Sequence, residues 1–202
     1  GALPRDEAFA VSAKPDPRHW RSPLKRGHVA QALSHRAAWR RFLEESTLDH
    51  LIVLEDDADV NGNFTDVFGA VLAKLDEVYP AFHDLYDLLY LRVPWDDYRD
   101  DPELNLNQFL NRVYPFAKLT GYVISRKGAA KLLRLTKALA MPLPVLVNNL
   151  ALQHDLAAYV LRQRGLVGDK GQHPRTLSDP ALLRMFGTKL RSRVDHTPAW
   201  VS

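Results

Sequence analysis

The stretch Leu51-Ile52-Val53-Leu54-Glu55-Asp56-Asp57-Ala58-Asp59 decides the fold that we expect for this chain. Its four consecutive apolar residues predict a strand that is buried on both faces. Four carboxylates follow within five residues. Carboxylates this crowded repel one another, so a bound cation would explain the arrangement. The stretch therefore predicts a strand that ends at a polar site.

Side chains alternate along an extended chain, which would place Glu55, Asp57 and Asp59 on one side and Asp56 on the other. Oxygen ligands of this kind suit Mg²⁺ or Mn²⁺. In open α/β sheets, ligands bind beyond the carboxyl ends of the strands. A simpler alternative stays open, in which the acids only end the strand and cap the next element.

The remaining elements alternate between helix and strand. Helices are predicted at about 28–45, 65–78, 125–140 and 145–164, and strands at about 8–11, 51–54, 87–91 and 121–124. This alternation predicts an α/β sandwich of the nucleotide-binding kind, with a mixed, mostly parallel sheet flanked by helices. We expect one α/β domain over residues 1–180 and a basic C-terminal tail over residues 181–202.

The composition excludes several classes of protein. The chain has 202 residues, of which 46% are hydrophobic and 25% charged, as in an ordinary globular domain. No apolar run is long enough to span a membrane, and the N-terminus lacks a signal-peptide pattern. The sequence has no cysteine, which excludes disulfides and thiolate metal sites. We expect a cytoplasmic protein.

Charge is distributed unevenly although the net charge is only +3. Residues 84–103 hold seven acids against two arginines, and residues 161–202 hold eight Arg or Lys against three Asp. The basic end could meet phosphates, anionic lipid of the inner membrane, or the acidic half of its own fold. Aromatic and basic residues do not interleave as on a nucleic-acid surface, so we expect no nucleic-acid partner.

Two other features have both a structural and a functional interpretation. His35 lies on the apolar stripe of the first helix, one turn before Trp39, where a hydrogen-bonded core histidine is more common than a functional one. The stretch Pro94-Trp95-Asp96-Asp97-Tyr98 follows a predicted strand. Its aromatic and acidic side chains could bind a sugar, or they could belong to an ordinary solvated loop.

Several motifs occur together in an informative order. They are Gly27-His28, Ala32-Leu33-Ser34-His35, Trp39, Leu54-Glu55-Asp56-Asp57 and Gly121-Tyr122-Val123-Ile124-Ser125-Arg126-Lys127-Gly128-Ala129. Over roughly residues 8–178 the chain resembles glycosyltransferase family 25, which includes bacterial lipooligosaccharide galactosyltransferases and collagen galactosyltransferases. The resemblance implies a GT-A type α/β fold and a nucleotide-sugar donor, usually UDP-galactose. It also implies Mn²⁺ or Mg²⁺ at the Glu-Asp-Asp element and inversion at the anomeric carbon.

The resemblance also suggests roles for individual residues. Glu55, Asp57 and Asp59 would hold the metal, with His173 as a further ligand. Ser34, His35, Glu55, Asp56, Ser125 and Arg126 would line the donor site. The carboxylate that takes the proton of the acceptor hydroxyl is not identified by the motifs, and the candidates are Asp96, Asp97 and Asp155.

The chain departs from the family pattern at two places. Members begin with a strand that ends in an Asn-Leu-Asp-Arg-like motif, whereas this chain aligns from Ala10-Val11, so we expect it to lack that first strand. Where the family tends to have Pro-x-Asp, this chain has Asn148 and Asn149 after Pro144. Two alternatives therefore remain beside a transferase of hexose to a saccharide or glycoconjugate. One is a non-catalytic interaction domain with the same fold, and the other is a metal-dependent phosphoesterase.

Overall fold

The computed structural model describes residues 9–11, 23–92, 104–162 and 166–169. Four predictions lie outside these ranges: the candidate bases Asp96 and Asp97, the candidate ligand His173, and the basic tail 181–202.

A five-stranded mixed sheet lies at the centre of the molecule. Its order is β2 (His50–Leu54), β6 (Gly121–Ser125), β4 (Leu88–Tyr90), β8 (Ala158–Leu161) and β5 (Leu110–Arg112). Only the β4–β8 pair is parallel, and the β2–β6, β4–β6 and β5–β8 pairs are antiparallel. The prediction of an α/β fold with a mixed sheet is confirmed, but most pairings within this sheet are antiparallel rather than parallel.

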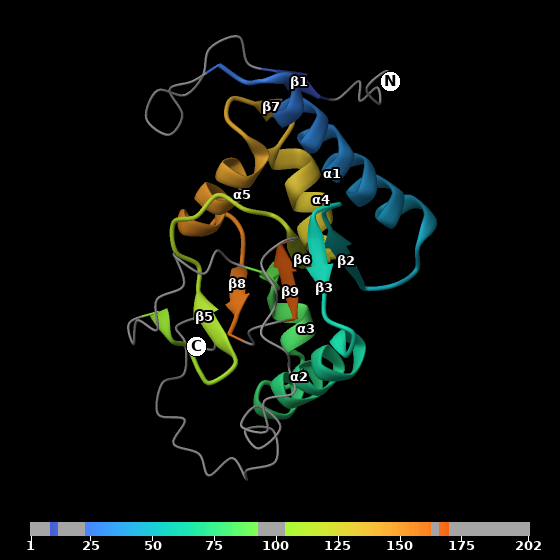
Figure 1. Cartoon of the computed structure of the whole chain (residues 1–202), viewed down its shortest axis with the longest axis vertical. Helices are drawn as coiled ribbons and strands as arrows, with labels where there is room; N and C mark the ends of the chain where they lie inside the picture. Colours follow the sequence, from blue (N-terminus) through green and yellow to red (C-terminus); the bar gives the residue numbers. More distant parts are fainter. Residues whose placement is uncertain (1–8, 12–22, 93–103, 163–165, 170–202) are drawn as a thin grey trace.

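Helices cover both faces of this sheet (Figure 1). The helices are α1 (Arg26–Glu45), α2 (Phe64–Val78), α3 (Phe82–Leu85), α4 (Arg126–Leu135) and α5 (Leu143–Leu152). Alternate strand residues define the two layers. Tyr90 and Tyr122 share one core cluster with residues of α1, α4 and α5, while Leu89 and Val123 share another with residues of α2 and α3. The alternation of side chains along each strand therefore produces a three-layer α/β/α arrangement.

Two short pairs of strands flank the central sheet. β1 (Ala10–Val11) pairs in parallel with β7 (Ala138–Leu139), and β3 (Ala58–Val60) pairs antiparallel with β9 (Val167–Asp169). β3 begins directly after Asp57 and contains Asp59, so the first three acids of the stretch connect β2 to β3.

Helices α1 and α4 are joined through reciprocal arginine contacts. The Arg126 guanidinium donates to the carbonyl oxygens of Leu43 and Ser46 at the end of α1, at 2.8 and 2.7 Å. Arg36 of α1 donates to the Leu133 carbonyl at the end of α4, at 2.8 Å. Each cation thus satisfies carbonyl groups at the negative end of the other helix, which stabilises the pair.

The predicted element boundaries differ from the structure in the C-terminal half. The helix expected at 145–164 ends at Leu152, and the chain forms β8 instead. His154 adopts a left-handed backbone conformation with φ of 63°, which interrupts the helix. The β-prone residues Tyr159 and Val160 then join the sheet. Similarly, the helix expected at 125–140 ends at Leu135.

No helix in the described part of the chain is long and apolar enough to cross a membrane.

Candidate active site at the end of strand β2

A hollow of about 650 Å³ lies between α1 and the carboxyl end of β2. Residues at helical spacing on α1 form one wall, and the end of β2 with the acidic turn forms the other. The lining residues are Gly27, His28, Gln31, Ser34, His35, Ala38, Val53, Leu54, Glu55, Asp56 and Asp57. Its volume is within the range of small-molecule sites in proteins.

The strand that ends at this hollow is the edge strand of the sheet. Residues of β2 are only partly buried, with Ile52 41% and Leu54 40% exposed. The prediction of a strand was correct, whereas the prediction that both of its faces are buried was wrong. Leu51 and Val53 pack against the core, whereas the alternating residues Ile52 and Leu54 are exposed.

The acidic residues lie in a tight turn rather than an extended chain. The Glu55 amide donates to the Thr120 carbonyl at 2.9 Å, and the Glu55 carbonyl accepts from the Ala58 amide at 3.0 Å. This turn places Asp56 and Asp57 at its tip, where both are exposed. Aspartate favours such positions. The alternation predicted for an extended chain is therefore wrong.

Glu55 is held from α1 by two side chains. Its Oε1 atom accepts from Gln31 Nε2 at 2.6 Å and lies 3.1 Å from His35 Nε2. The Glu55 side chain remains 19% exposed, whereas that of His35 is 5% exposed. The carboxylate thus lies at the boundary between the core and the hollow.

The contacts continue from His35 into the core. His35 Nδ1 lies 2.8 Å from the Tyr122 hydroxyl, and Trp39 Nε1 donates to the same hydroxyl at 2.8 Å. Tyr122 and Trp39 are fully buried. Burial raises the pKa of Tyr122 well above its ordinary value, with Glu55 contributing in the same direction. The Tyr122 hydroxyl therefore remains protonated and can donate.

Ser125 and Arg126 lie away from the hollow. In the pairing of β2 with β6, Ser125 is opposite His50 while Gly121 is opposite Leu54. Ser125 is therefore separated from the end of β2 by about 13 Å along the strand. The Ser125 hydroxyl accepts from the Gly128 amide at 3.1 Å as the N-cap of α4, and Arg126 binds the end of α1. These contacts give both residues a structural role.

Asp155 also lies at the other end of the sheet. It precedes β8, whose first residue, Ala158, pairs with Leu88 at the start of β4. A second hollow of about 700 Å³ occurs there, lined mostly by apolar residues together with Arg112 and His154. Asp155 is exposed and is not among the residues that line either hollow.

Residues 6–147 match the model of glycosyltransferase family 25, described as an LPS biosynthesis protein. The chain belongs to glycosyltransferase family 25. No curated protein matches the chain significantly.

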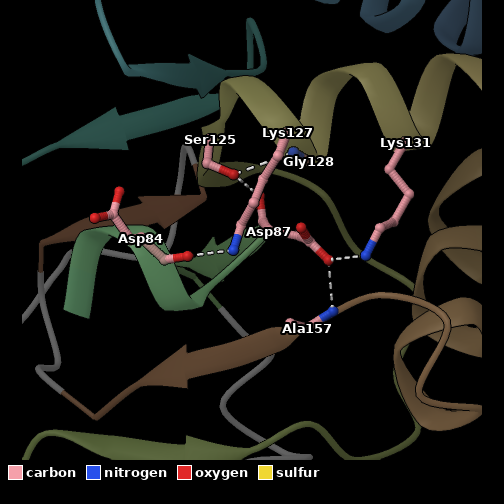
Figure 2. A network of polar contacts seen from close by, with 7 residues as sticks. All are labelled: Asp84, Asp87, Ser125, Lys127, Gly128, Lys131 and Ala157. Carbon is pink, nitrogen blue, oxygen red and sulfur yellow. Dashed lines mark hydrogen bonds and ion pairs between the residues drawn. The ribbon is translucent and has the colours of Figure 1, made fainter. Parts of the chain in front are cut away.

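Within this family 25 chain, the motifs fall into two groups. Ser34, His35, Glu55, Asp56 and Asp57 are gathered at one hollow. Ser125 and Gly128 belong to a polar network around Asp87 (Figure 2), whereas Arg126 binds the end of α1. The motifs that mark the family thus include one candidate binding site and one structural element.

The resemblance implies a divalent metal ion at the acidic turn, whose side chains line the hollow. In the described ranges, no group of three or more His, Cys, Asp or Glu side chains is placed to hold a metal ion. Mg²⁺, however, is commonly held by one or two carboxylates together with substrate phosphates, and the hollow is lined by two exposed carboxylates, Asp56 and Asp57. Asp59 lies on β3 and does not line the hollow.

The asparagine at position 148 has a structural explanation. Asn148 is buried, donates to the Tyr114 carbonyl at 3.1 Å, and accepts from the Phe116 amide at 3.2 Å. It satisfies two backbone groups of the segment that leads into β6.

Sequence analysis missed three members of the site. Gln31 and His28 lie one and two turns before His35 on α1, so helical spacing from His35 could have found them. Tyr122 was assigned only to a strand, and its approach to His35 depends on how α1 packs on β6. No local sequence pattern contains that information.

Proposed function

We propose that this chain transfers a hexose, galactose, from a UDP-sugar to a saccharide or glycoconjugate acceptor in LPS biosynthesis. The family match supports the class of reaction. The hollow at the end of β2 supports a location for this reaction, because the acidic motif and the Ser34-His35 motif both line it. A GT-A arrangement is part of the same proposal.

The donor would bind with its diphosphate near the acidic turn. Asp57 and Asp56 are exposed at the hollow and would hold Mn²⁺ or Mg²⁺ together with the phosphate oxygens. Such an ion supplies Lewis-acid stabilisation of the charge on the departing nucleotide. The first turns of α1, where Gly27 and His28 line the hollow, place the positive end of a helix on the opposite wall.

Inversion at the anomeric carbon requires a carboxylate that accepts the proton of the acceptor hydroxyl. We assign this role to Asp96 or Asp97, which follow β4 in the sequence. β4 and β2 both pair antiparallel with β6, so their carboxyl ends lie at the same edge of the sheet. Asp155 is a weaker candidate because it lies at the opposite edge.

The test is a calorimetric titration of UDP and UDP-galactose into the chain, with and without Mn²⁺. We expect metal-dependent binding that weakens about tenfold or more in the Asp57→Ala variant, because a charged contact to the bound ion is lost. Asp59→Ala is the matched control, since Asp59 lies two residues further along and does not line the hollow. Its affinity should equal that of the wild type.

Other outcomes would favour the alternatives. Release of phosphate from generic phosphate esters would indicate a phosphoesterase. Absence of nucleotide binding, with equal behaviour of both variants, would indicate a non-catalytic interaction domain and overturn the proposal.

A further inference from the structure

We infer that His35 is a positioning residue, which orients Glu55 at the edge of the hollow through a directed hydrogen-bond chain from Trp39 and Tyr122. This differs from the expectation that His35 itself contacts the donor. Both ring nitrogens are already engaged by protein groups, at 2.8 Å to Tyr122 and 3.1 Å to Glu55. The ring is almost fully buried.

The chemistry of the groups determines the direction of the chain. The Trp39 indole can only donate, so the Tyr122 oxygen accepts from it. The Tyr122 hydroxyl proton is then available to His35 Nδ1, which accepts. The other nitrogen, Nε2, consequently carries a proton and donates it to the Glu55 carboxylate. An imidazole that accepts at Nδ1 and carries a proton on Nε2 satisfies every group in this series of hydrogen bonds.

Glu55, the last acceptor in this series of hydrogen bonds, gives His35 a role beyond that of a hydrogen-bonded core histidine. Glu55 Oε1 receives two hydrogen bonds from α1, one from His35 and one from Gln31. The backbone of Glu55 also begins the turn that presents Asp56 and Asp57. The side chain and the backbone of Glu55 are therefore both fixed. Because Asp56 and Asp57 follow Glu55 in the same turn, their positions are fixed through it.

Nuclear magnetic resonance tests this series of hydrogen bonds without any ligand. The ¹⁵N shifts of the His35 ring should report the tautomer with the proton on Nε2. Tyr122→Phe removes the donor to Nδ1 and should shift the ring toward a mixture of tautomers. Tyr90→Phe is the matched control, because Tyr90 pairs with Tyr122 across β4 and β6 and is equally buried. It should leave the ring of His35 unchanged.

Two substitutions of His35 separate positioning from packing. His35→Gln can place an amide N–H near the position of Nε2 and so retain the donor to Glu55. His35→Asn is shorter and can only replace Nδ1. With UDP and Mn²⁺ as the probe, we expect affinity to fall about tenfold in the Asn variant and to be largely restored in the Gln variant.

The binding part of this test rests on the proposed function, whereas the tautomer does not. A wild-type ring with its proton on Nδ1, or equal loss of affinity in the two His35 variants, would overturn the inference. If the wild-type protein binds no UDP, the proposed function fails. The tautomer of His35 and its response to Tyr122→Phe then decide alone whether the series of hydrogen bonds from Trp39 to Glu55 is present.

Discussion

Two carboxylates near opposite ends of the sheet have opposite environments. Glu55 follows β2, is 19% exposed, and accepts hydrogen bonds from the uncharged amide of Gln31 and from His35. Asp87 precedes β4, is 2% exposed, and forms an ion pair with Lys131 at 2.5 Å. The Asp87 carboxylate also accepts from the Ala157 amide at 2.9 Å. Asp87 thus has its charge balanced within the protein.

The two ends of the sheet differ in which polar groups are exposed and can contact a ligand. At the Asp87 end, a buried acid, a lysine and backbone amides satisfy one another (Figure 2). At the Glu55 end, the acidic turn adds Asp56 and Asp57, which are exposed beside a hollow. Burial and the charge of the partner, rather than residue type, separate the structural acid from the candidate binding acids.

The largest expected effect comes from crowding the Asp87 end. A Cβ atom on Gly128 would lie 2.1 Å from the Asp87 carbonyl oxygen, which is a backbone atom. Since neither backbone can move without displacing β4 or α4, Gly128→Ala should destabilise the fold by about 3 kcal/mol or more. Chemical denaturation followed by circular dichroism would measure this.

Gly69→Ala provides the control for that substitution. Gly69 lies within α2, and a Cβ atom there would meet nothing within 4 Å. This variant should be stabilised by about 0.5 to 1 kcal/mol, because alanine has the higher helix propensity. A similar response of the two glycines would mean that the close approach of α4 to Asp87 is not present.

Removing the charge of Asp87 should have the next largest effect on stability. Asp87→Asn keeps the size of the side chain but leaves Lys131 without its counterion. Lys131 is 33% exposed and can turn toward water, so we expect a loss of about 2 to 3 kcal/mol, below the usual range for a broken buried pair. Thermal and urea unfolding would measure the loss.

The matched control for Asp87 is Asp84→Asn. Asp84 is 74% exposed, and its substitution should change the unfolding free energy by less than about 0.5 kcal/mol. Adding Lys131→Met to Asp87→Asn should recover part of the stability, because it removes the unpaired cation. If Asp87→Asn behaves like Asp84→Asn, the ion pair contributes nothing and the contrast between the two ends of the sheet is lost.

Sequence patterns predicted the elements whose signals are local. Helical periodicity identified α1 and α2, the helix expected from residue 125 begins there with Ser125 as its N-cap, and the apolar run with its acids identified the end of β2. Pairing directions were not predictable in the same way, because the β4–β6 and β5–β8 contacts join segments distant in the chain. The expectation of mostly parallel strands came from the alternation of elements, which does not specify strand order.

The candidate site was also predicted only in part, because some of its residues have local sequence signals and others depend on tertiary packing. The acidic stretch and His35 were found as motifs, and the structure places His35 with Glu55, Asp56 and Asp57, but not Asp59, around one hollow. The roles of Ser125 and Arg126 could not be separated from ligand binding by sequence, since a cap and a phosphate ligand use the same side chains. Arg126 binds carbonyl groups of α1 that lie about 80 residues earlier, a contact that only the tertiary packing creates.

Among the three principal substitutions, Gly128→Ala, Asp87→Asn and Gly27→Ala, the smallest change in stability is expected at the Glu55 end, where it tests the hollow itself. Gly27 lines the hollow in the first turn of α1, and a Cβ atom there would meet nothing within 4 Å. Gly27→Ala should therefore leave the fold intact and stabilise it by about 0.4 to 1 kcal/mol.

Gly27→Phe should also fold, because its Cβ atom would meet nothing within 4 Å, and its ring would obstruct the wall that we propose faces the donor. We expect weaker binding of UDP-galactose in the Phe variant than in the Ala variant, measured by calorimetric titration with Mn²⁺. The melting temperatures of the two variants should be similar, which shows that both are folded. Equal affinities would place the donor away from α1. Only the Glu55 end should show this separation of binding from stability, because a Cβ at Gly128 meets backbone whereas a Cβ at Gly27 meets open space.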